Sequence, residues 1–481
     1  MTSALPNSDF GLKLLWIFLW AAIAAIIALT GIVSPQIGRV LAIIVSIVFV
    51  AAIRWNYHRL VIVLLVVLSA IGLPNKLIAI QLANGDNLFG IRDVLILAVI
   101  VVGLITGRDQ LAIVLNAPLL RPGLWLTALL PIAVVNGLLN SGSPLMVARE
   151  MIALSTGWLL ALSVAANLRD WNLIKKLLDI CTALGLGVAA GAALEIVTGN
   201  SVKIVSQYQQ TVVEGVSRNF PEGIILVFFA ASFAAAGLLS GDRKWKNTPI
   251  AIAVCLSFLL LQTRFYLVSY LASIYTVLVI ARVTHSKWLK TRAVIPITAA
   301  AIVAMGTGAY AISRMGGSEL LESSVQRYQD IIQDAGDRIY ELEMVTSAMR
   351  DHPVLGTGLG VAYREVEFSG EEDIFHHADT FVHVAPAYFL LKFGPLGLML
   401  FVVFGVRVVM STAKVTKLGE PTISRKYLLA IHIFLLFCLI EALAANLFGD
   451  VKLMPAVGVI LGIAVALQNL PKMIVSAVDL G

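Results

Sequence analysis

The chain has 481 residues, of which 59% are hydrophobic and 13% are charged. Soluble domains carry about 25% charged residues, so this composition excludes an ordinary soluble protein. The net charge of +6 fits the excess of Lys and Arg that orients membrane proteins. Because the basic residues form no stripe, we expect no nucleic-acid partner.

Long apolar stretches follow one another along the chain, and many approach the ~18–20 residues that cross a ~30 Å hydrocarbon core. They predict an all-α fold class, a polytopic helical membrane protein with about 12–14 transmembrane helices. In chain order the expected spans are residues 13–33, 38–53, 60–74, 91–106, 124–139, 147–167, 174–197, 222–240, 248–262, 265–283, 293–312, 385–410, 427–447 and 453–469. The three cysteines lie inside apolar stretches without a CxxC pair, which predicts neither a disulfide nor a zinc site.

The positions of Lys and Arg predict how these spans are oriented. With the N-terminus in the cytoplasm, the inner loops hold 19 Lys and Arg, and the short outer loops hold far fewer. This asymmetry is the positive-inside pattern. It predicts a multi-pass protein with both termini in the cytoplasm.

One long polar segment interrupts the apolar pattern and divides the chain. Residues 1–312 are expected to hold transmembrane helices 1–11, residues 313–384 to form a long extracytoplasmic loop, and residues 385–481 to hold the C-terminal transmembrane helices. The positive-inside count places the loop outside the cytoplasm.

Inside this loop, residues 337–350 predict an amphipathic helix. Its apolar stripe is Ile339, Leu342, Val345 and Met349, and Glu341, Glu343 and Arg350 lie away from that stripe. Pro353 ends the helix, and the sequence GTGLG at 356–360 is expected to be a flexible turn.

A few ionisable residues lie where apolar spans begin or end, and such residues need a physical reason. Arg218 and Arg264 are expected at outer ends of spans, where arginine is suited to phosphate oxygens. Arg149 and Glu150, also at an outer end, are expected to form a local ion pair. These arginines indicate a lipid-linked phosphate or diphosphate as ligand, although each could also be a simple interfacial anchor.

His383 lies where the long loop returns to the next span, and a histidine there can accept a proton near neutral pH. It could equally be an interfacial histidine that caps the helix. His376, His377 and Asp379 have no ligand spacing such as HxxxH, so we expect no metal site. No cofactor is expected.

Four segments resemble motifs of the O-antigen ligase and O-antigen polymerase superfamily, which assembles bacterial surface polysaccharides. They are HPVLGTGLG at 352–360, His383 followed by GPLG at 394–397, Thr263-Arg264, and the sequence RNFP at 218–221. With the single long outer loop, the resemblance covers roughly residues 120–400. Two departures are Val384, where the ligases usually have Asn, Ser or Gln, and the missing glycine after Arg218.

The resemblance implies a membrane glycosyltransferase of the GT-C type in the bacterial inner membrane. It would polymerise or ligate surface polysaccharide on the outer face, from a glycan on undecaprenyl diphosphate, without metal and with inversion at the sugar carbon. His383 would be the catalytic base, Arg218 and Arg264 would bind the diphosphate, and Arg338 is a third candidate for that role. Val384 favours a polymerase or exopolysaccharide assembly enzyme over a ligase.

The expected partners are the lipid-linked donor, a polysaccharide or lipid-linked acceptor, membrane lipids, and flippase and chain-length regulator proteins. Two alternatives remain open at this point. One is a transporter of a small anion or a lipid, which would have discontinuous helices and charges near the bilayer midplane. The other is a scaffold of a polysaccharide export complex without chemistry of its own.

Overall fold

The computed structural model describes residues 79–81, 87–90, 96, 100, 103–104, 106–198, 209–213, 216–220, 223–241, 264–287, 289, 331–363, 382–417, 423–449 and 453–479. The expected spans at 13–33, 38–53, 60–74, 248–262 and 293–312 lie outside these residues. So do Cys255, His376, His377 and Asp379.

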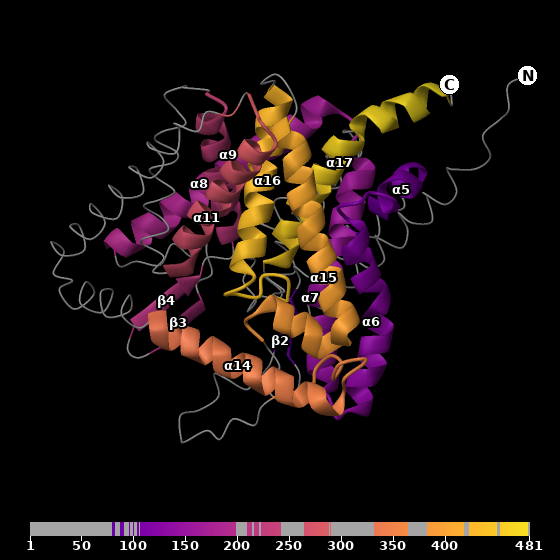
Figure 1. Ribbon diagram of the computed structural model, residues 1–481, viewed down its shortest axis with the longest axis vertical. Coiled ribbons are helices and arrows are strands. Elements are labelled where there is room, and N and C mark those ends of the chain that lie inside the picture. The colour runs from indigo at the N-terminus through magenta and orange to yellow at the C-terminus, as the bar shows by residue number, and fades with distance from the viewer. Residues whose placement is uncertain are drawn as a thin grey trace, which may run out of the picture.

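Within the described residues the chain is predominantly helical (Figure 1). The helices are α5 (Arg108–Leu115), α6 (Arg121–Leu139), α7 (Pro144–Asn167), α8 (Trp171–Thr198), α9 (Ile224–Leu239), α11 (Arg264–Val283), α14 (Ile331–Asp351), α15 (Ala385–Lys417), α16 (Ile423–Glu441) and α17 (Met454–Asp479). Three segments, Arg121–Leu139, Met146–Asn167 and Ala385–Lys417, are long and apolar enough to cross a membrane. The prediction of a helical membrane protein agrees with this.

Two short antiparallel hairpins were not predicted. The first pairs β1 (Ala79–Gln81) with β2 (Asn87–Gly90), and the second pairs β3 (Gln209–Val213) with β4 (Val216–Phe220). The register joins Val213 to Val216, so the sequence Glu214-Gly215 alone separates β3 from β4. This spacing suits a two-residue hairpin. Arg218 therefore lies in β4, and α9 starts only at Ile224.

Close helix packing builds the core of the bundle. α7 packs along α17, and α9 packs against α8 and α16. At the α7–α17 contact a Cβ on Gly458 would lie 2.3 Å from the carbonyl oxygen of Gly157. A side chain at position 458 would therefore push the two helices apart, as is typical where small residues let membrane helices approach.

α14 lies across one end of the bundle, and β2, β3 and β4 lie at that same end (Figure 1). The C-terminal end of α17 lies at the opposite end. We call these the α14 end and the α5 end, because α5 packs beside the C-terminal half of α7. The topology expected from the Lys and Arg positions puts the segments of the α14 end outside the cytoplasm, so the fold gathers residues that were expected on one face of the membrane.

α15 is broken at Gly394, where φ is 68° and ψ is −164°. The next residue, Pro395, has no N–H to donate to the carbonyl of Leu391. The backbone N–H of Thr357 donates to that carbonyl instead, at 2.7 Å. The expected single span at 385–410 is thus a short segment, 385–393, and a longer one, 395–417. The longer segment alone measures about 35 Å.

Candidate functional site

A cluster of polar contacts lies where α14 meets the start of α15. Glu341 on α14 is 4% exposed. Its Oε1 accepts hydrogen bonds from the backbone N–H of His383 at 2.9 Å and from the Tyr363 hydroxyl at 3.1 Å. The same oxygen lies 3.0 Å from His383 Nδ1, and the His383 side chain is 42% exposed. Glu341 thus holds both the backbone and the ring of His383.

The contact with Glu341 determines which ring nitrogen of His383 carries the proton. Burial raises the pKa of Glu341, but the hydrogen bonds from His383, its charge and that of Arg338 outweigh burial and bring the pKa below its usual value of 4.5. Glu341 is therefore a carboxylate at neutral pH and can only accept hydrogen bonds. Nδ1 must carry the proton, and the lone pair of the neutral ring lies on Nε2, the nitrogen that can act as a base.

Arg338, one helical turn before Glu341, also belongs to this site. Its Nη1 lies 3.8 Å from Glu341 Oε2, and its side chain is about one-third exposed. The structure therefore brings two of the predicted residues, His383 and Arg338, together through Glu341. The other two are placed only by their backbones, Arg218 in β4 and Arg264 at the first residue of α11. Their contact with the site stays a prediction.

The predicted apolar stripe of α14 is wrong in its first half. Val345 and Met349 are buried as expected, but Ile339 is 59% exposed and Leu342 is exposed as well. Glu341, expected away from this stripe, is buried and continues the Val345–Met349 row at a spacing of four residues. This face of α14 is turned inward because the Glu341 carboxylate accepts hydrogen bonds from Tyr363 and His383.

The GTGLG turn is buried, which corrects the expectation of a flexible turn. Gly356, Gly358 and Gly360 have φ between 70° and 86°, a region that favours glycine. Asn136 of α6 and Asn140, the residue that follows this helix, donate side-chain hydrogen bonds to the carbonyls of residues 356 and 357, at 2.7 and 3.0 Å. A Cβ on Gly358 would lie 2.1 Å from the backbone nitrogen of Gly137. The turn is therefore locked onto α6.

A second buried charge pair lies beside this turn. Lys392 of α15 is fully buried, and its Nζ lies 3.2 Å from Glu150 Oε1. Glu150 Oε2 accepts the backbone N–H of Gly360 at 2.8 Å. The predicted pairing of Glu150 with its neighbour Arg149 is replaced by this contact between helices. Lys392 went unnoticed in the sequence, although a lysine inside the apolar run YFLLKFG was itself a signal.

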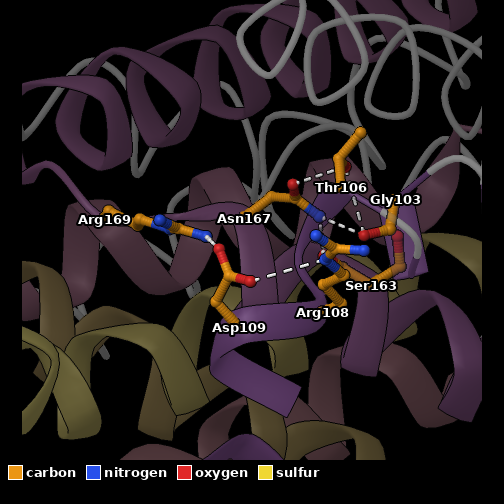
Figure 2. A network of polar contacts seen from close by, with 7 residues as sticks. All are labelled: Gly103, Thr106, Arg108, Asp109, Ser163, Asn167 and Arg169. Atoms are coloured by element: carbon orange, nitrogen blue, oxygen red, sulfur yellow. Dashed lines mark hydrogen bonds and ion pairs between the residues drawn. The ribbon is translucent and has the colours of Figure 1, made fainter. Parts of the chain in front are cut away.

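The α5 end holds a different polar network (Figure 2). The Asn167 side chain donates to the carbonyls of Gly103 and Ser163, at 2.7 and 2.8 Å, and accepts from Thr106 at 2.8 Å. Nearby, Asp109 forms ion pairs with Arg108 at 3.6 Å and Arg169 at 3.8 Å. These contacts join helix ends.

Among the described residues, no group of three or more His, Cys, Asp or Glu side chains could hold a metal ion. The described site holds a histidine oriented by a buried carboxylate, next to an arginine.

No model of a known protein family matches the chain, and a comparison with curated protein sequences finds no similar one.

Proposed function

We propose that the protein is a membrane glycosyltransferase that uses a lipid-linked diphosphate glycan as donor, on the face of the bacterial inner membrane outside the cytoplasm. The observation that carries this proposal is the His383–Glu341 pair at the α14 end, with Nδ1 held by a buried carboxylate. Such a pair supports proton removal from a sugar hydroxyl, as a carboxylate orients a histidine base in other transfer reactions.

In the proposed step, the acceptor hydroxyl loses its proton to His383 Nε2 while its oxygen forms a bond to the anomeric carbon of the donor sugar. The bond from that carbon to the diphosphate oxygen breaks, and the carrier lipid leaves as its diphosphate. Attack opposite the leaving group inverts the anomeric carbon. Glu341 stabilises the imidazolium that forms, which is why a buried carboxylate is useful there.

Arginines stabilise the charge on the leaving diphosphate in this proposal. Arg338 lies on the same helix as Glu341. Arg218 lies in β4, at the α14 end, and Arg264 is the first residue of α11. Fixed positive charge where negative charge develops is a large contribution to catalysis. The negatively charged diphosphate of the bound donor would contact all three arginine side chains.

The broken helix α15 bears on the alternative of an anion or lipid transporter. Discontinuous helices in transporters meet near the bilayer midplane. Here the segment after the break, 395–417, is long enough at about 35 Å to cross the hydrocarbon core alone. The break and the Glu150–Lys392 pair then belong to one end of the span, which favours chemistry at the membrane surface.

The test is transfer by the purified protein in lipid vesicles that contain an undecaprenyl-diphosphate-linked glycan. We expect product from the wild type, and no product from His383→Ala or Arg264→Ala at equal protein levels. Turnover at the wild-type rate by His383→Ala would show that His383 is not the base.

Deletion of the gene distinguishes the two glycosyltransferase classes. Surface glycans that stop at one repeat unit mean polymerase, the class favoured by Val384. Polymer that accumulates on the carrier lipid means ligase. Unchanged glycans, together with altered uptake of anions or lipids, would support a transporter.

A further inference from the structure

The buried ion pair of Glu150 and Lys392 is not used by the proposed reaction, yet it contacts the segment that leads to the base. Lys392 Nζ donates to the carbonyl of Val361 at 3.0 Å, and Glu150 Oε2 accepts from the N–H of Gly360 at 2.8 Å. The two charges thus hold two consecutive backbone groups, one as donor and one as acceptor.

The same short segment also contacts the base pair. Two residues after Val361, the hydroxyl of Tyr363 donates to Glu341 Oε1, the oxygen that receives both bonds from His383. Residues 360–363 therefore lie between the buried ion pair and the carboxylate.

A second connection runs through α15. Lys392 lies near the end of the short segment 385–393, which starts two residues after His383. Lys392 is thus tied to the base by its own helical segment and, through Tyr363, by residues 360–363.

We propose that Glu150 and Lys392 are positioning residues for the His383–Glu341 pair. Neither charge can leave its place without leaving the other unpaired in a buried site, which is strongly unfavourable. The pair therefore fixes the backbone at 360–361, and Tyr363 passes this constraint to the Glu341 carboxylate. The inference rests on the proposed function only in naming His383 as the base, because the mechanical link does not depend on the reaction.

Two backbone amides report on this link without any activity measurement. The Gly360 amide donates to Glu150 and the His383 amide donates to Glu341, so hydrogen exchange at each amide reports on one end of the link. The experiment uses the full-length protein in lipid nanodiscs, with mass spectrometry of peptides that contain Gly360 or His383.

We expect Lys392→Met to speed exchange about tenfold or more at both amides, the change that follows from the loss of a charge-assisted hydrogen bond. Tyr363→Phe should speed exchange at His383 and leave Gly360 unchanged, because it breaks only the last contact. Glu150→Gln keeps an acceptor for Gly360 and should give a smaller change than Lys392→Met. Lys414→Met, at an exposed position of the same helix, is the matched control and should change neither amide.

Unchanged exchange at His383 in both Lys392→Met and Tyr363→Phe would overturn the inference. If Lys392→Met does not fold, Tyr363→Phe and Glu150→Gln decide the question alone. In the transfer assay, positioning predicts that Tyr363→Phe lowers kcat and leaves KM for the donor unchanged. Coupled exchange in a protein without transfer would refute the proposed function and keep this link, whereas transfer without coupled exchange would refute the link alone.

Discussion

Glu341 at the α14 end and Asp109 at the α5 end each lie 3.8 Å from an arginine nitrogen. Their surroundings differ. Glu341 is 4% exposed and accepts bonds from His383 and Tyr363, whereas the Asp109 side chain is 61% exposed. Water screens an exposed pair, so its net contribution is about 0–1 kcal/mol. Ion pairs of equal length therefore differ in how much they stabilise the fold, and the buried pair is the one that fixes the structure around it.

The two ends also differ in what their polar groups hold. At the α14 end, side chains from α6, α7 and α15 hold the loop that joins α14 to the bundle. At the α5 end, the buried Asn167 joins the ends of helices, and the charged side chains remain in contact with solvent. We therefore expect substitutions to lower the free energy of unfolding strongly at the α14 end, and by smaller, graded amounts at the α5 end.

The largest effect on stability is expected for Gly358→Ala. Its φ of 86° and the 2.1 Å approach of a Cβ to the backbone of Gly137 leave no room for a side chain. We expect a loss of about 3 kcal/mol or more in the free energy of unfolding, measured by denaturant titration in detergent. Gly187→Ala is the matched control, since a Cβ at position 187 would have no neighbour within 4 Å, and it should gain up to about 1 kcal/mol. Equal stability of the two variants would contradict the locked turn.

An intermediate effect is expected for Asn167→Ala at the α5 end. The change leaves the carbonyl of Gly103 and the hydroxyl of Thr106 without the Asn167 amide, which costs about 1–3 kcal/mol. Asn116 is exposed, follows the last residue of α5 and donates its side-chain hydrogen bond to the carbonyl of Ala112 in that helix. Asn116→Ala should therefore stay within about 0.5 kcal/mol of the wild type. The same unfolding titration measures both, and a smaller loss for Asn167 than for Asn116 would mean that the buried network is not formed.

The smallest effect is expected for Asp109→Asn. It removes the ion pairs to Arg108 and Arg169, which are exposed, and should cost about 0–1 kcal/mol. High salt should abolish even this difference between variant and wild type. A loss as large as that of Asn167→Ala, unaffected by salt, would show that exposure does not separate the two ends.

Much of the fold could be predicted from residue patterns. Apolar length predicted α6, α7 and α15 as possible spans, and helical periodicity predicted the helix of α14. The break in α15 lies in the GPLG segment noted in the sequence, where Gly394 and Pro395 prevent a regular helix. The hairpins were missed because strands of three to five residues between long apolar runs have no clear alternation.

The contacts of the site could be predicted only in part. His383 and Arg338 were both named as candidate site residues, and the structure brings them together through Glu341. Glu341 itself was expected away from the apolar stripe of its helix, because a carboxylate is buried only when distant partners satisfy it. Those partners, Tyr363 and His383, follow it in the chain by 22 and 42 residues. The same reason hid the contact of Glu150 with Lys392, since local spacing favours the neighbour Arg149.

In the proposed reaction, His383 depends on the buried carboxylate of Glu341 to act as an effective base. Single-turnover transfer from an undecaprenyl-diphosphate-linked glycan, measured for Glu341→Gln and Glu343→Gln in lipid vesicles, tests this dependence most directly. Both residues lie on α14, but Glu343 is exposed, so the second variant controls for the loss of a charge on this helix. We predict that Glu341→Gln loses about 10²–10⁴-fold in rate and that Glu343→Gln keeps the wild-type rate. Transfer at the wild-type rate by a folded Glu341→Gln protein would show that His383 does not need this carboxylate.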